Sequence, residues 1–260
     1  MKNIILFSLL FSLVLFSCEK VIDLDLMSSD TMYVLEGAVT SGDSAHYLSI
    51  TTSIPFNQSN DFPIVDNATV TLTDNLGNTA AMIHIGEGIY EAQNYIAFDG
   101  RTYTMTAKIG ERTFTSTVAI PFTVTLFGAV VLPSSFFGQV GNLIVPGFQD
   151  PAQYKNYYRF RYQEKDSIDN DSGDIISNDD ISNGQVNQQP FIGAYLPASG
   201  DTVIYTMWGI DKSVYDFLYS KETNTSGNSG APANPVSNWS GDALGYFTAH
   251  NVQQIEIIIP

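Results

Sequence analysis

Three acidic side chains in one short run have the spacing closest to that of a metal site. Asp169, Asp171 and Asp174 lie in the run Asp-Asn-Asp-Ser-Gly-Asp. Alternating carboxylates can surround Ca²⁺ with oxygen ligands. However, Gly173 stands where that pattern needs an oxygen ligand, Asp174 stands where it needs glycine, and no glutamate closes the frame. We therefore expect a solvated acidic loop over residues 164–180, with weak calcium binding as the alternative, and no cofactor.

Two further sets of residues have types that could support catalysis. Gly42-Asp43-Ser44 is similar to the nucleophile block of one hydrolase family, but it lies between two expected strands and no Asp-x-x-His partner follows. Gly-Asp-Ser is also ordinary turn chemistry. His46, His84 and His250 are scattered along expected strands and lack ligand spacing. We expect a protein that is not an enzyme, with a hydrolase as a distant alternative.

Aromatic side chains crowd the second half of the chain and are the remaining candidates for ligand contact. Tyrosine and tryptophan fill binding interfaces, although most aromatics of a β protein pack in its core. Trp239 lies in a loop of Asn, Ser and Gly, where a tryptophan is hard to bury. Trp239, and with it Trp208, are therefore the expected ligand-binding residues.

Cys18 is the only cysteine of the chain, and the residues before it favour lipidation. Lys2 precedes an apolar stretch from Ile4 to Phe16, and Leu15-Phe16-Ser17-Cys18 resembles a lipobox, with Phe16 larger than is usual. The stretch is short for a membrane span, so residues 1–17 are predicted to be a signal peptide. A thiolate can be alkylated by diacylglycerol, and two or more acyl chains, at about 0.8 kcal/mol per buried methylene, hold a protein at a membrane. The alternative is an ordinary secretory signal.

Charge limits the partners of the chain. The 260 residues carry a formal net charge of −16. Nucleic acid would be repelled by such a chain, and so would an anionic lipid surface. With no second cysteine for a disulfide, stability has to come from packing. Membrane attachment is expected through the lipid alone.

The first part of the mature chain has the pattern of a β-sandwich. An acidic tether is expected over residues 18–30, followed by an immunoglobulin-like sandwich over 31–120 that ends near Pro121. Val70 and Tyr103 are expected in its core. Short runs rich in Thr, Val and Tyr, separated by turn residues, predict strands at 33–39, 47–53, 68–74, 79–85, 89–90, 101–107 and 112–119.

Residues 121–260 are expected to form a second β-rich domain with one helix. The helix is predicted over 211–222, with Asp211 or Ser213 as its N-cap and apolar residues at helical spacing. Loops are predicted at 146–151, 164–180 and 223–240. Alternation or apolar runs predict strands at 122–132, 157–163, 191–196, 202–210, 244–248 and 252–259.

Several segments together resemble the lipoproteins grouped as a domain of unknown function, DUF4249. The more specific ones are the start, Cys18 to Leu26, and the ending, Asn234-Pro235 through Gly245-Tyr246-Phe247. Val34 to Gly37 and the blocks 68–78 and 100–105 also match, and the middle block is similar to carboxypeptidase-regulatory-like and immunoglobulin-like sandwiches. Asp242-Ala243 departs from the double glycine expected before Leu244.

The resemblance implies an outer-membrane lipoprotein of Gram-negative bacteria, at the periplasmic or cell-surface face, often encoded beside TonB-dependent receptors. The resemblance implies no catalytic residues for this chain. We therefore expect a non-catalytic, lipid-anchored accessory that binds a ligand or docks on a TonB-dependent transporter. The alternative is a surface adhesin or glycan-binding module.

Overall fold

The structure is a computed structural model, and it describes residues 30–55, 58–136, 139–225 and 233–260. Residues 31–260 form one compact unit. The predicted signal peptide, Cys18 and nearly all of the tether lie outside the described residues. Within the described ranges, no helix is long and apolar enough to cross a membrane.

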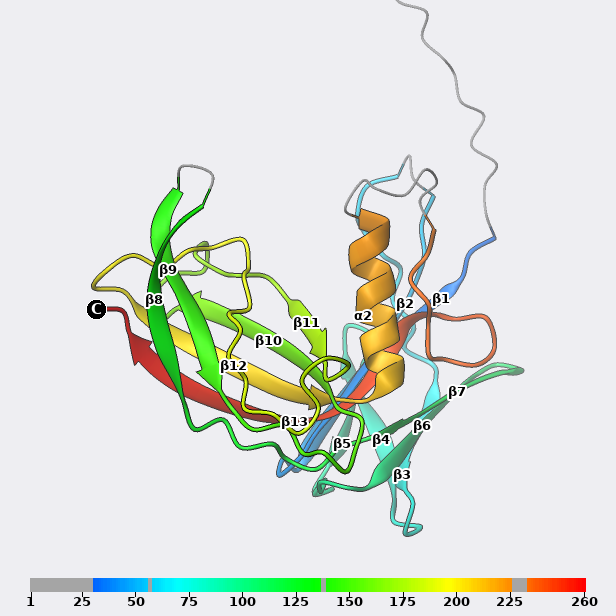
Figure 1. Cartoon of the computed structure of the whole chain (residues 1–260). Helices are drawn as coiled ribbons and strands as arrows, with labels where there is room; N and C mark the ends of the chain where they lie inside the picture. Colours follow the sequence, from blue (N-terminus) through cyan, green and yellow to red (C-terminus); the bar gives the residue numbers. More distant parts are fainter. Residues whose placement is uncertain (1–29, 56–57, 137–138, 226–232) are drawn as a thin grey trace, which may run out of the picture. The chain divides into compact units, whose positions relative to one another are not determined.

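About half of the described chain is strand and the described residues hold one short helix, which confirms the expected mostly-β class (Figure 1). A two-stranded sheet pairs β8 with β9, and the other strands form one eleven-stranded sheet in the order β11-β10-β12-β13-β1-β2-β5-β4-β3-β6-β7. The elements are β1 (Tyr33–Thr40), β2 (Ala45–Thr52), β3 (Thr69–Asp74), β4 (Thr79–Gly86), β5 (Ile89–Gln93), β6 (Thr102–Ile109), β7 (Arg112–Ala119), β8 (Gly128–Phe136), β9 (Gln139–Gly147), β10 (Tyr157–Glu164), β11 (Ile175–Asn178), β12 (Thr202–Ile210), α2 (Lys212–Thr225) and β13 (Leu244–Ile258).

The first seven strands fold back on themselves as a sandwich. Every second residue of β6 is buried, including Tyr103 and Met105, and the same alternation in β3 buries Val70. Gly37 of β1 lies against Met105, since a Cβ at Gly37 would be 3.0 Å from the Met105 sulfur. Strand β1 therefore packs face to face on β6, and the predictions that Val70 and Tyr103 are core residues are confirmed.

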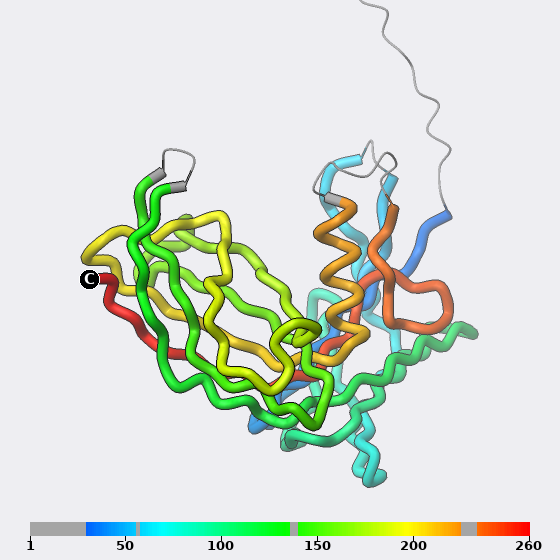
Figure 2. The backbone as a smooth tube through the Cα atoms, in the orientation of Figure 1, coloured from blue at the N-terminus to red at the C-terminus, as the bar shows by residue number. Residues whose placement is uncertain are grey.

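The C-terminal strand β13 is shared by the two halves of the chain (Figure 2). Its first part pairs with β1 in parallel, from Val34 with Leu244 to Thr40 with His250. Its second part pairs antiparallel with β12. Two buried clusters lie on either side of this junction, one around Leu35, Tyr103 and Phe247 and the other around Phe160 and Tyr205. The domain boundary near Pro121 stays a prediction; the structure adds that the last strand serves both clusters.

The two predicted C-terminal strands, 244–248 and 252–259, are one continuous strand. The polar residues between the two predicted strands have hydrogen-bond partners within the sheet region. His250 lies between Thr40 and Thr248, and the Asn251 amide donates to the Pro121 carbonyl over 2.8 Å. Polar residues with satisfied hydrogen bonds can therefore continue the strand.

Other predictions for the second half were wrong in detail. The predicted strand at 122–132 begins only at Gly128, β9 was not predicted, and its last two residues overlap the predicted loop at 146–151. Residues 191–196 form no strand: Phe191 instead stacks on Phe160 with ring centroids 4.2 Å apart and covers the second cluster. The predicted acidic loop contains β11, which pairs with β10 at the edge of the large sheet.

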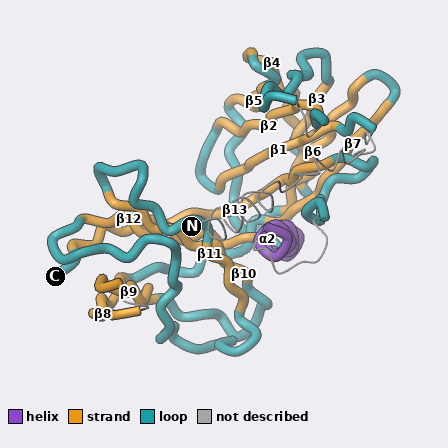
Figure 3. The backbone as a smooth tube through the Cα atoms, turned by 90° about the horizontal axis from the view of Figure 1, so that it is seen from above, coloured by secondary structure: helices purple, strands orange, loops and turns teal. Residues whose placement is uncertain are grey.

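Helix α2 confirms the predicted helix and its cap. The Asp211 carboxylate accepts a hydrogen bond from the Ser213 amide over 2.8 Å, which satisfies one of the free donors at a helix start. The helix lies beside β10, β11 and β13, as the end-on view in Figure 3 shows. Phe217 of the helix stacks on Tyr246 of β13 with centroids 4.3 Å apart.

Candidate functional site

Trp239 is buried, which corrects the expectation that a tryptophan in this loop would be exposed. Only 6 % of the residue is accessible, and its indole N–H donates to the Leu35 carbonyl over 2.9 Å. The next residue, Ser240, forms backbone and side-chain hydrogen bonds to Thr115 on the edge strand β7. The loop thus covers a sheet edge and places Trp239 in the first cluster, where a ligand cannot stack on its ring.

Trp208 is half-buried and its ring is already occupied. The Arg159 guanidinium lies 4.8 Å from the ring centroid, a cation–π contact between neighbouring strands. Arg159 also forms an ion pair of 2.6 Å with Asp174. Trp239 is therefore a core residue, and Arg159 covers one face of the Trp208 ring.

Two of the three calcium candidates are engaged by arginines of β10. Asp174 pairs with Arg159, and Asp171 pairs with Arg161 over 2.6 Å. Although burial raises the pKa of Asp171, the hydrogen bonds from Arg161 and the Gly173 amide lower it overall. Within the described residues, no group of three or more His, Cys, Asp or Glu side chains could hold a metal ion. The arginines neutralise the carboxylates that a cation would need.

The histidines and the Gly-Asp-Ser segment have structural roles. Gly42-Asp43-Ser44 is a turn held by backbone bonds to Thr40, Tyr95 and Ala97. His46 is buried, with Nε2 2.7 Å from the Tyr95 carbonyl, and burial lowers its pKa. These contacts tie a turn to the neighbouring segment and bring no second catalytic group to Ser44.

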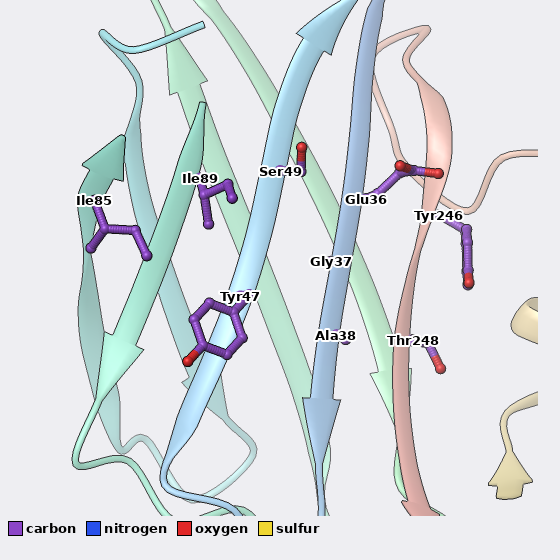
Figure 4. A pocket seen from close by; sticks show the side chains of 9 residues that line it. All are labelled: Glu36, Gly37, Ala38, Tyr47, Ser49, Ile85, Ile89, Tyr246 and Thr248. Carbon is purple, nitrogen blue, oxygen red and sulfur yellow. The ribbon is translucent and has the colours of Figure 1, made fainter. Parts of the chain in front are cut away.

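A groove lies on the outer face of the large sheet, across β13, β1, β2, β5 and β4. Its volume is about 420 Å³. Figure 4 shows its side chains over neighbouring strands, with Tyr47 and Ile85 on one side and Tyr246 on the other. We call it the sheet-face groove; it is lined by Glu36, Gly37, Ala38, Tyr47, Ser49, Ile85, Ile89, Tyr246 and Thr248.

Strand pairing explains why these residues meet. Glu36 is paired with Ser49 on β2 and with Tyr246 on β13, and Ala38 is paired with Tyr47 and Thr248. Paired residues place their side chains on the same face of a sheet. The alternate residues of β1, such as Leu35 and Val39, point to the opposite face and are fully buried. The same alternation therefore builds the core on one face and the groove on the other.

Small side chains form the floor of the sheet-face groove, and large exposed ones form its walls. Ala38, Ser49 and Thr248 leave the hollow between the strands. Tyr47 is 45 % exposed and Ile85 is 51 % exposed. Exposed tyrosine and isoleucine around a concave floor can bury apolar area against a partner, and a tyrosine hydroxyl can also form a hydrogen bond.

The groove carries negative rather than positive charge. Glu36 is the only acidic residue in its lining, which holds no lysine, arginine or histidine. The Tyr47 hydroxyl donates to Glu91 over 3.0 Å, and this hydrogen bond raises the pKa of Tyr47. Burial raises the pKa of Tyr246. The positive charge of Arg159 lowers this pKa, and the nearby Asp174 and Glu36 raise it further. Both tyrosines are thus neutral hydrogen-bonding groups at pH 7.

Sequence reasoning missed the groove because its residues come from separate strands. The only available signal was alternation: Glu36 and Ala38 alternate along the strand with the buried residues Leu35, Gly37 and Val39. That pattern identifies an outward face, but it does not say which strands lie beside it.

The fold is that of a mostly-β chain with an open groove on the outer face of its large sheet. A family model described as "Domain of unknown function (DUF4249)" matches residues 19–256 of the chain. The chain therefore belongs to the DUF4249 family. Comparison with curated proteins gives no match.

Proposed function

We propose that this chain is a non-catalytic, lipid-anchored accessory of the outer membrane that docks on a TonB-dependent transporter. The observation that carries the proposal is the sheet-face groove, with exposed tyrosine and isoleucine walls over a floor of small residues. Tyrosine is enriched at the energetic centre of protein interfaces, and exposed aliphatic side chains add apolar area that binding can bury.

The lining of the groove favours binding over chemistry. General acid–base catalysis needs a proton donor and acceptor placed at a reacting atom. The groove offers one carboxylate, Glu36, and hydroxyl groups, with no histidine, cysteine or lysine among its lining residues. Such a surface can recognise a partner, while a hydrolase would need groups that these strands do not supply.

Charge favours a partner surface that is neutral or basic. The chain carries −16 overall, and Glu36 and Glu91 lie in or beside the groove. Complementary charge raises association rates, and like charge opposes the wrong partners. A second copy of this acidic chain would therefore be a poor occupant of the groove.

A lipid on Cys18 would make a weak contact sufficient. Anchoring at the membrane of the receptor raises the effective concentration of one protein around the other. The sole cysteine after an apolar signal-like stretch supports this anchor. Cys18→Ala should move the protein from the membrane to the soluble fraction, whereas unchanged partitioning into detergent would exclude the lipid anchor.

A surface adhesin or glycan-binding module remains the alternative proposal. Its original candidate residue, Trp239, is buried. A glycan would therefore have to bind a different surface from the one that the sequence suggested.

Affinity purification from solubilised outer membranes tests the docking proposal. The tagged full-length chain should recover a TonB-dependent transporter, and Tyr47→Ala should reduce the recovery several-fold. Tyr154→Ala is the matched control, because Tyr154 is also about half exposed but lies outside the groove. Equal recovery by both variants, or hydrolytic activity of the pure protein without any bound transporter, would overturn the proposal.

A further inference from the structure

A second groove lies beside β11 and the beginning of α2, and its chemistry differs from that of the sheet-face groove. Its volume is about 910 Å³. It runs between β11, the segment 181–191 and Tyr215 of the helix. We call it the amide groove, because side-chain amides dominate its lining: Asn178, Gln185, Asn187, Gln188 and Gln189.

The amide groove is uncharged in a strongly acidic chain. None of its lining residues is an aspartate, glutamate, lysine, arginine or histidine. Its remaining lining residues are serines, aliphatic residues and the rings of Phe191 and Tyr215. An ion entering this groove would meet no opposite charge, so the lining selects for a neutral ligand.

Three of the amides are free to bind a ligand. Gln185, Gln188 and Gln189 are exposed, and among the described residues their side chains form no hydrogen bond. Each amide offers one carbonyl acceptor and two N–H donors. A set of free donors and acceptors in one hollow matches a ligand that carries many groups able both to donate and to accept.

The backbone that carries these amides is held in place. The Asn187 side chain donates to the Pro146 carbonyl over 2.9 Å, and its backbone amide donates to the Phe148 carbonyl over 2.9 Å. The Gln185 carbonyl accepts from the Asp150 amide over 3.0 Å. Because these contacts fix the segment against β9 and the loop after it, ligand binding would not have to order it.

An aromatic wall completes the groove. Tyr215 is held by Asn178, whose amide donates to the tyrosine hydroxyl over 3.2 Å. Its ring also contacts the rings of Tyr157 and Tyr219, with centroids 5.2 and 6.0 Å away. A fixed aromatic ring beside free amides presents an apolar surface next to hydrogen-bonding groups, as small-molecule sites commonly do.

We propose that the amide groove binds a neutral oligosaccharide. Sugar hydroxyls both donate and accept hydrogen bonds, so they can pair with the free glutamine amides, while the C–H groups of a sugar ring can contact the part of Tyr215 that lines the groove. An extended peptide would use the same edge of the sheet by pairing with the backbone of β11, and it would not need the glutamines. The proposal is independent of transporter docking, because the two grooves share no lining residue.

Binding of defined probes to the full-length protein in detergent tests the assignment. The probes are neutral glucan, mannan, xylan and galactan oligosaccharides, oligogalacturonate as a charged control, and an uncharged peptide library. Calorimetry should detect binding of at least one neutral oligosaccharide. Because a single net hydrogen bond is worth up to about a factor of ten in affinity, Gln185→Ala and Gln188→Ala should each weaken it by up to about tenfold.

A matched control variant shows whether an effect on oligosaccharide affinity is specific to the amide groove. Gln153→Ala is the control, because Gln153 is also exposed and forms no hydrogen bond among the described residues, but lies outside the groove. It should leave oligosaccharide affinity unchanged. The proposal is overturned if no neutral oligosaccharide binds, if the groove variants bind as the parent does, or if peptides bind and oligosaccharides do not.

Discussion

His250 illustrates how a single side chain of β13 ties that strand to β1. Its two ring nitrogens lie 3.1 Å from the Thr40 hydroxyl and 3.2 Å from the Thr248 hydroxyl. Burial lowers its pKa to about 4, with smaller contributions from the positive charges of Arg159 and His46. The imidazole is therefore neutral at pH 7 and acts as a hydrogen-bonding bridge beside the sheet-face groove.

This environment predicts a loss of stability in mild acid. In the unfolded chain His250 takes up a proton near its ordinary pKa of 6.5, while in the folded chain it does so only near pH 4. The unfolded state thus binds more protons between these values, so stability falls as the pH falls from about 6.5 to 4, by at most about 3 kcal/mol. Urea unfolding of the parent and of His250→Gln across this range measures the effect.

The variant should lose less stability than the parent over that range. Burial lowers the pKa of His46 in both proteins, and lowered carboxyl pKa values such as that of Asp74 also act in both. The difference between the two proteins therefore reports on His250. Parallel pH profiles for parent and variant would show that His250 is not held neutral in the folded chain.

At the scale of the elements, the parallel contact of β1 with β13 depends on a close backbone approach at Gly245. This residue has a φ of 85°, and a Cβ there would lie 2.2 Å from the Leu35 carbonyl oxygen. Only glycine fits without moving β1. The departure Asp242-Ala243 lies in the turn before this strand, and Asp242 itself has a positive φ of 57°.

Gly245→Ala should therefore disrupt the pairing of β1 with β13. The variant combines backbone strain with a direct clash, so we expect a loss of more than about 3 kcal/mol in the free energy of unfolding. Gly42→Ala is the control: it has a similar φ of 83°, but nothing lies within 4 Å of the added methyl group. Chemical denaturation should give the control a loss of only about 1 kcal/mol, and equal losses would show that the clash at Gly245 is relieved.

Strand β3 gives a direct test of the sandwich core. Val70 is 2 % exposed, so Val70→Asp buries an unpaired carboxylate and should destabilise the chain by several kcal/mol, on the order of 3–5. Thr69→Asp, one residue earlier, places the same group on the exposed side of the strand. Thermal unfolding followed by circular dichroism should show a large fall in midpoint for the first variant and a small one for the second; similar midpoints would contradict the assigned inward face.

The sequence predicted the elements that depend on interactions between residues close together in the chain. Strand β12 and helix α2 are recognisable because alternation and an Asp211 cap act within a few residues. The sheet-face groove was not predictable in this way, because Glu36 and Tyr246 meet only through the parallel pairing of β1 with the last strand. Trp239 was mispredicted for the same reason: the edge that it covers belongs to β7, far away in the sequence.

At the scale of the whole molecule, charge is distributed very unevenly along the chain. Residues 113–149, which include β8 and β9, contain no charged residue or histidine, although the chain carries −16 overall. The outward residues Val130 and Leu132 of β8 are 59 % and 45 % exposed. The acidic groups therefore leave uncharged areas in which apolar contacts with a partner would not be opposed by like charge.

Site-specific photo-crosslinking in the native outer membrane tests the docking proposal most directly. With p-benzoylphenylalanine in place of Tyr47, on the wall of the sheet-face groove, we expect a covalent product with a TonB-dependent transporter, identified by mass spectrometry. With the same group in place of Tyr154, which lies outside that groove and is similarly exposed, we expect no such product. A transporter product from both positions, or from neither, would contradict docking through the sheet-face groove.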